Sequence, residues 1–187
     1  MADWKPGLIL TPDELTPAAI GLIKACLSPV HVVGITAWRE AEARFEDGHW
    51  TPNPVEAMAD IANIVNNRAN DKRWSAKGYK GVCLARWQFS CWEPNGGPDD
   101  PKDIDTLAEN FEVVMYAAQK LIAGVRPSGK LQACMGIAEG CVAGYMTDTL
   151  SNATHYYATW IAPPRWAQPP SRFIVERYGH RFYAGVA

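Results

Sequence analysis

The sequence predicts a mostly helical α+β domain that ends in a small β-hairpin. Apolar residues recur at three- and four-residue spacing in several segments, and the longest covers residues 102–124. Hydroxyl or amide residues followed by proline mark the starts of the earlier segments, as expected for helix N-termini. Near the end of the chain, two runs rich in aromatic and β-branched residues flank Tyr178-Gly179, which is typical of a hairpin.

The first two helices are predicted from their start signals. Thr16-Pro17 supplies an N-cap and a first-turn proline, so a helix is expected over residues 17–27. Ser28-Pro29 restarts the pattern, and a second helix is expected from Val30 to Phe45.

The rest of the chain alternates between clear helices and less regular stretches. Asn53-Pro54 opens a third helix that closes near residues 66–68, and the fourth is the long segment already described. Residues 71–91 and 124–144 contain several glycines and no clean helical period, so both are expected to be loop-like. Residues 145–171 carry four prolines and are expected to form an irregular, ordered wrap.

Length and composition limit the classes of protein that the chain can represent. The 187 residues suit one domain, and we expect an N-terminal helical extension (1–28) packed on a catalytic domain (29–187). The near balance of 18 basic and 20 acidic residues argues against a dedicated nucleic-acid binder. No apolar stretch reaches 18 residues, and the N-terminus does not resemble a secretory signal. We therefore expect no stable membrane insertion and synthesis in the cytoplasm, and we also expect a monomer.

Five cysteines leave at least one thiol unpaired. No Cys-x-x-Cys pair occurs and no histidine lies at zinc-site spacing from a cysteine, so we expect no bound metal. Buried, inert thiols are the simplest interpretation, and a Cys134–Cys141 disulfide across a glycine-rich loop is the alternative.

An acidic segment at the end of the second predicted helix is the first candidate for chemistry. It reads Glu40-Ala41-Glu42-Ala43-Arg44-Phe45-Glu46. Glu42 and Glu46 are four residues apart and would share a helix face. In a partly closed site, repulsion and desolvation would raise one carboxyl pKa, as a general acid requires. A solvated charged face balanced by neighbouring arginines is the alternative.

Two aromatic segments are further candidates. The chain has eight tryptophans, and two of them enclose an amide and a hydroxyl in residues 87–92, which contain Gln88, Ser90 and Trp92. Sugar sites combine such stacking faces with hydrogen-bonding groups, although an aromatic core loop would have the same composition. Residues 152–157 contain His155, which could be a base, a ligand or a structural histidine.

Motifs of other enzyme classes are missing from the sequence. There is no G-x-S-x-G, H-E-x-x-H or phosphate-binding loop. A Cys–His peptidase stays open, because His155 or His180 could meet Cys91 or Cys141 in space, although no local signature supports it.

Taken together and in order, these segments resemble the SleB/CwlJ family of cell wall hydrolases, which includes spore cortex-lytic enzymes and phage endolysins. The resemblance covers roughly residues 30–185. Its motifs are Glu42-Ala43-Arg44-Phe45-Glu46, Asn67-Arg68, Gln88-Phe89-Ser90, Ala153-Thr154-His155-Tyr156, Trp166-Ala167 and Gly179-His180-Arg181-Phe182-Tyr183. Phe45 stands where the family commonly has glycine, and the segment 124–150 is longer than usual.

The resemblance implies a lysozyme-like, mostly helical fold and cleavage of peptidoglycan between N-acetylmuramic acid and N-acetylglucosamine. It favours a lytic transglycosylase without cofactor or metal, in which Glu42 is the general acid and base. Glu46 would lie on the same side of the substrate and would tune its neighbour. The residues expected to bind the glycan are Glu46, Gln88, Ser90, Trp92, Thr154, His155 and Tyr156.

Three other activities are kept as alternatives: a hydrolytic muramidase or glucosaminidase, a Cys–His peptidoglycan peptidase, and a glycan-binding module without turnover. Because no export signal is visible, we expect a phage endolysin that is released from the cytoplasm and acts in the periplasm and cell wall during host lysis.

Overall fold

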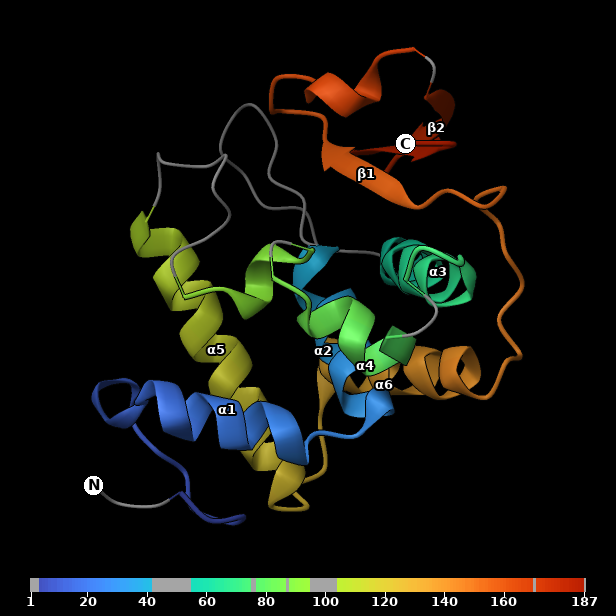
Figure 1. Cartoon of the computed structure of the whole chain (residues 1–187). Coiled ribbons are helices and arrows are strands. Elements are labelled where there is room, and N and C mark those ends of the chain that lie inside the picture. Colours follow the sequence, from blue (N-terminus) through green and yellow to red (C-terminus); the bar gives the residue numbers. More distant parts are fainter. Residues whose placement is uncertain are drawn as a thin grey trace.

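The computed structural model describes residues 4–41, 55–74, 77–86, 88–94, 104–169 and 171–186. In these residues a group of helices is followed by a three-stranded antiparallel sheet, which lies at one end of the helical part (Figure 1). This confirms the predicted mostly helical α+β class.

The first two helices begin where the sequence predicts. Helix α1 (Pro17–Cys26) is capped by Thr16, whose hydroxyl accepts from the amide of Ala19 at 3.2 Å. Helix α2 (Pro29–Glu40) is capped in the same way by Ser28. Six consecutive residues of α2 are buried, because it packs against α3, α4, α5 and α6 and so lies at the centre of the helical part.

Two other helices also match their predictions. Helix α3 (Val55–Asn70) carries the apolar stripe expected of it and continues a few residues beyond the predicted end. Helix α5 (Ile104–Ile122) forms from the long amphipathic segment, and α1 packs across it (Figure 1). Both helices depend on burial of one apolar face, which is the main source of helix stability in proteins.

Two segments that were expected to be loops are helices. Helix α4 (Gly78–Leu84) and helix α6 (Gly129–Val142) both fall in the glycine-containing stretches. Tertiary packing overrides the low helix propensity of glycine there. In α6, Cys134, Ala138 and Cys141 recur at helical spacing and are fully buried against α2 and α3.

A glycine in α2 permits this packing. A Cβ atom at Gly34 would lie 2.4 Å from Cε of Met135 and 3.4 Å from the carbonyl oxygen of Cys134. The small residues of α2 and α6 therefore serve close helix–helix approach. The proposed Cys134–Cys141 disulfide is wrong, since both thiols are free and lie two helical turns apart, about 10 Å along the axis.

The sheet consists of β1 (His155–Ala158), β2 (Arg172–Arg177) and β3 (His180–Ala184), in the order β1-β3-β2. Strands β2 and β3 form the predicted hairpin, with an irregularity between Phe173 and Val175. Strand β1 arises within the stretch that was expected to be irregular, where Tyr156 pairs with Phe182. Alternation along β1 directs Tyr156 and Tyr157 to opposite faces of the sheet.

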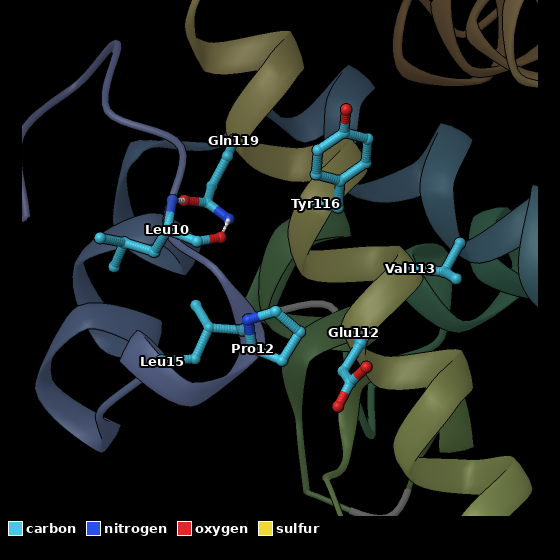
Figure 2. Close-up of a pocket in the computed structure, with 7 residues that line it drawn as sticks. All are labelled: Leu10, Pro12, Leu15, Glu112, Val113, Tyr116 and Gln119. Atoms are coloured by element: carbon cyan, nitrogen blue, oxygen red, sulfur yellow. Dashed lines mark hydrogen bonds between the residues drawn. The ribbon is translucent and has the colours of Figure 1, made fainter.

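The N-terminal segment before α1 packs on α5. The side-chain amide of Gln119 accepts from the backbone amide of Leu10 at 2.7 Å and donates to its carbonyl at 3.5 Å (Figure 2).

No single helix in the described part of the chain is long and apolar enough to span a membrane. Among the described helices, α1 and α2 together reach the required length and apolar character, but the chain bends by 112° between them.

Candidate functional site

The C-terminal end of α2 presents a carboxylate toward the sheet-bearing end of the molecule. Glu40 is the last residue of α2 and is partly buried, whereas residues 32–37 of the same helix are fully buried. A negative charge in the last turn faces the negative end of the helix dipole, which costs roughly 0.3–1 kcal/mol. Hydrogen bonds from outside the helix must therefore offset that cost.

Three donors bind the two carboxylate oxygens of Glu40. The Ser90 hydroxyl and the Cys91 backbone amide donate to Oε1 at 3.1 and 2.8 Å. The Tyr156 hydroxyl donates to Oε2 at 2.8 Å. Each carboxylate oxygen can accept about two hydrogen bonds. Within the described residues Oε1 is thus fully used, whereas Oε2 keeps room for another partner.

The donors come from two segments that the sequence analysis singled out. Ser90 and Cys91 belong to the short 3-10 helix η3 (Ser90–Trp92), and Tyr156 lies in β1. Burial raises the pKa of Tyr156 well above its ordinary value, and the charge of Glu40 acts in the same direction. The phenol is therefore a neutral, permanent donor toward Glu40.

Arg68 of α3 joins the same two segments through hydrogen bonds to their backbone. Its Nε donates to the carbonyl of Thr154 at 2.7 Å, and its Nη1 donates to the carbonyl of Gln88 at 3.3 Å. The guanidinium lies 4.9 Å from the centre of the Phe89 ring and 5.3 Å from that of Trp74. Arg68 is the arginine of the Asn-Arg pair noted in the sequence.

The structure positions the predicted residues of the 88–92 segment differently from one another. Ser90 is exposed and bonds Glu40, and Gln88 is partly buried and contributes its carbonyl to Arg68. Trp92 is only 1% exposed, and its indole nitrogen donates to the Thr36 hydroxyl at 2.8 Å. The Trp92 ring supports the end of α2 from within the core and offers no open face for stacking.

Thr154 and His155, the two residues before Tyr156, have side chains that contact each other. Thr154 is 3% exposed, and its hydroxyl lies 3.0 Å from Nδ1 of His155. The His155 ring packs between Trp74 and Trp166, with ring centres 5.7 and 5.1 Å away. Burial, with the charges of Arg68 and Arg73, lowers the pKa of His155 to about 4. His155 is therefore neutral at neutral pH.

Glu42, Glu46 and Trp87 lie outside the described residues. The prediction that Glu42 acts as the acid stays a prediction. Sequence reasoning passed over Glu40, which stands in the same acidic segment two residues earlier. The signal that could have found it is its position just after a helical segment, residues 32–37, that contains no charged side chain.

The thiols of the Cys–His alternative lack the character of nucleophiles. Cys91 and Cys141 are fully buried. Burial raises the pKa of the Cys91 thiol well above its ordinary value and that of Cys141 to about 12. Because only the thiolate attacks, both cysteines are inert at neutral pH.

A separate cavity of about 250 Å³ lies between the N-terminal segment and α5 (Figure 2). Its walls are mainly apolar and include Leu15, Val113 and Tyr116. It shares no residue with the Glu40 cluster.

Within the described ranges, no three His, Cys, Asp or Glu side chains come together as a metal site would require.

A family model described as cell wall hydrolase matches residues 52–184, which cover the Arg68, Ser90 and Tyr156 parts of the site. The comparison with curated proteins found no match, and neither did the comparison with solved structures. The matched range begins after α2, so Glu40 and the rest of the acidic segment precede it. Because the match covers well over half of the chain, the protein belongs to the cell wall hydrolase family, whose enzymes act on peptidoglycan.

Proposed function

We propose that this enzyme is a lytic transglycosylase that cleaves glycan strands between N-acetylmuramic acid and N-acetylglucosamine. The proposal has a single glutamate as general acid and base, and we assign this role to Glu40, the one glutamate of the acidic segment that lies within the described residues. The observation that carries it is the convergence of Ser90, Cys91 and Tyr156 on that carboxylate. Two of these donors are side chains from the segments that the family resemblance marks.

The chemistry requires one carboxyl group to act twice. The protonated Glu40 would give its proton to the glycosidic oxygen as the bond from that oxygen to the anomeric carbon breaks. The resulting carboxylate would then take the proton of the muramoyl 6-hydroxyl, and the oxygen of that hydroxyl would attack the anomeric carbon. The product carries a 1,6-anhydro ring, and no water is consumed.

The hydrogen bonds around Glu40 suit this double role. Oε1 is held by two donors and fixes the orientation of the carboxylate. Oε2 accepts from Tyr156 and, among the described residues, has no second donor, so a lone pair can serve the proton that moves to and from the substrate. A preorganised carboxylate of this kind needs little rearrangement during the reaction.

Product analysis on purified peptidoglycan tests the proposal. We expect wild-type enzyme to release soluble muropeptides whose muramoyl ends are lighter by one water than reducing ends. Glu40→Gln should abolish release while the protein keeps its circular dichroism spectrum and thermal midpoint. Full release by Glu40→Gln would overturn the assignment of Glu40.

Glu42→Gln and Glu46→Gln provide the matched comparison in the same acidic segment. If Glu40 is the acid, both variants should keep at least a substantial part of the activity. If Glu42→Gln alone is inactive, the acid is Glu42, as the sequence analysis expected, and the transglycosylase mechanism stands with that residue.

The same digestion separates the remaining alternatives. Reducing ends would identify a hydrolytic muramidase or glucosaminidase, which needs a second carboxylate and a water molecule. Cleaved peptide crosslinks would identify a peptidase, and binding without soluble product would identify a glycan-binding module. The role as a phage endolysin stays a proposal, and lysis of a host after expression with and without a holin would test it.

A further inference from the structure

We propose that Arg68 is a positioning residue for cleavage: its guanidinium holds together the two segments that orient the Glu40 carboxylate. This inference rests on the proposed function. It assigns a role in the reaction to a residue that does not touch the carboxylate.

The first argument is the burial of Arg68 without an acidic partner among the described residues. Arg68 is 5% exposed, and its described hydrogen bonds go to backbone carbonyls. No ion pair of the described residues includes it. A buried guanidinium is costly unless nearby groups compensate its charge. The rings of Phe89 and Trp74 supply part of that compensation.

The second argument is connectivity. The carbonyl of Gln88 lies two residues before Ser90, and the carbonyl of Thr154 lies two residues before Tyr156. One rigid guanidinium therefore fixes the backbone just upstream of both donor side chains. A shift of either segment would move a donor away from Glu40. Errors of about 1 Å in such positions cost roughly 100-fold in rate.

The third argument is charge. Burial lowers the pKa of Arg68, whereas the negative charge of Glu40 is among the effects that act in the opposite direction. This electrostatic effect supports the argument from connectivity, although within the described residues no hydrogen bond joins the guanidinium to the Glu40 carboxylate. Arginine stays protonated at all physiological pH values. Arg68 is thus a fixed positive charge beside a carboxylate that must gain and lose a proton.

Arg68→Lys tests the inference because it keeps the charge and loses the two-pronged geometry. In the peptidoglycan assay we expect kcat to fall about 10- to 100-fold with KM within about 3-fold of wild type. For Arg68→Ala, millimolar guanidinium ion should restore part of the lost kcat and leave wild-type activity unchanged.

Arg177→Lys is the matched control. Arg177 also joins the sheet to α3, through Asp60, but it has no described contact with the Glu40 cluster. We expect this control to lower the thermal midpoint and to keep wild-type kcat. If Arg68 were merely structural, Arg68→Lys would behave like Arg177→Lys, with a lower thermal midpoint and wild-type kcat, and guanidinium would not raise the kcat of Arg68→Ala.

The outcomes separate this inference from the proposed function. Wild-type kcat in Arg68→Lys, with Glu40→Gln inactive, would overturn the role of Arg68 alone. Wild-type enzyme that releases no glycan fragment would overturn both. If Arg68→Lys does not fold, Phe89→Leu keeps the arginine and removes one ring that holds it. That variant should lose about 3- to 10-fold in kcat, and wild-type kcat in it would overturn the inference.

Discussion

The hydroxyl of Tyr156 donates a 2.8 Å hydrogen bond to Oε2 of Glu40 across 116 residues of sequence. Glu40 ends the central helix, and Tyr156 lies in the first strand of the sheet. This contact joins the helical part to the sheet at the point where we propose catalysis. The Glu40 carboxylate is therefore oriented by the packing of the sheet on the helices.

Tyr156→Phe should lower kcat about 10- to 100-fold, because a hydrogen bond to a charged group contributes roughly 1.5–3 kcal/mol. The ring and its contacts with Phe182 and His180 would stay. Release of soluble muropeptides at saturating peptidoglycan measures the effect.

Tyr157→Phe is the control for this prediction. The Tyr157 hydroxyl accepts from Arg181 on the opposite face of the strand, at 3.2 Å. We expect wild-type kcat from this variant. Equal losses from the two substitutions would show that the Tyr156 hydroxyl acts only through the stability of the sheet.

The low pKa of His155 predicts an acid-sensitive fold. In the unfolded chain the imidazole titrates near 6.5, whereas burial and neighbouring arginines lower its pKa to about 4 in the folded protein. Between these values the unfolded state binds the extra proton, so stability falls as pH decreases from about 6.5 toward about 4. Thermal midpoints of wild type and His155→Gln at about pH 7.5 and about pH 5 measure this contribution.

His31 and His180 also have lowered pKa values because of burial, and both remain in the variant. Only the difference between wild type and His155→Gln therefore reports on His155. The pH-dependent loss should be smaller in the variant. An unchanged pH dependence would argue against a depressed pKa at this position.

The sequence predicted the elements whose start signals and apolar periods are local. Thr16 and Ser28 cap their helices as expected, and the C-terminal hairpin turns at Tyr178-Gly179. Helix α6 was missed because its face is made of small residues whose burial depends on a glycine in another helix. Cys134, Ala138 and Cys141 do recur at helical spacing, but such a stripe of small residues is a weak signal in a segment with several glycines.

The candidate site was predicted in part for the same reason. Ser90 was found from local composition and Tyr156 from the family resemblance, and both bond one carboxylate. Which glutamate of the acidic segment they would meet depends on where α2 ends and how the sheet docks. Neither the end of α2 nor the docking of the sheet can be derived from the spacing of residues within the acidic segment.

The close contact of α2 and α6 predicts that Gly34→Ala destabilises the protein. An added Cβ would lie 2.4 Å from Cε of Met135, so the methionine must move. We expect a loss of about 1–3 kcal/mol, although alanine is otherwise the better helix former. In a Met135→Ala background the same substitution should cost less, and a double-mutant cycle by chemical denaturation measures the difference. Additive costs would contradict the contact.

The pair of Asp60 and Arg177 predicts an asymmetric response to mutation. Asp60 is buried in α3, and Arg177 of β2 donates from Nε to its carboxylate at 2.6 Å. Burial raises the pKa of Asp60 in spite of the arginine. Arg177→Ala leaves a buried carboxylate without its partner and should cost about 2–4 kcal/mol near pH 7.5. Asp60→Asn leaves a guanidinium that is a third exposed and should cost less.

Because a raised carboxyl pKa lets the folded state take up the proton first, the loss of stability in Arg177→Ala should shrink as pH falls toward about 5. Urea unfolding of both variants at the two pH values measures this, and a deficit that grows on acidification would contradict it.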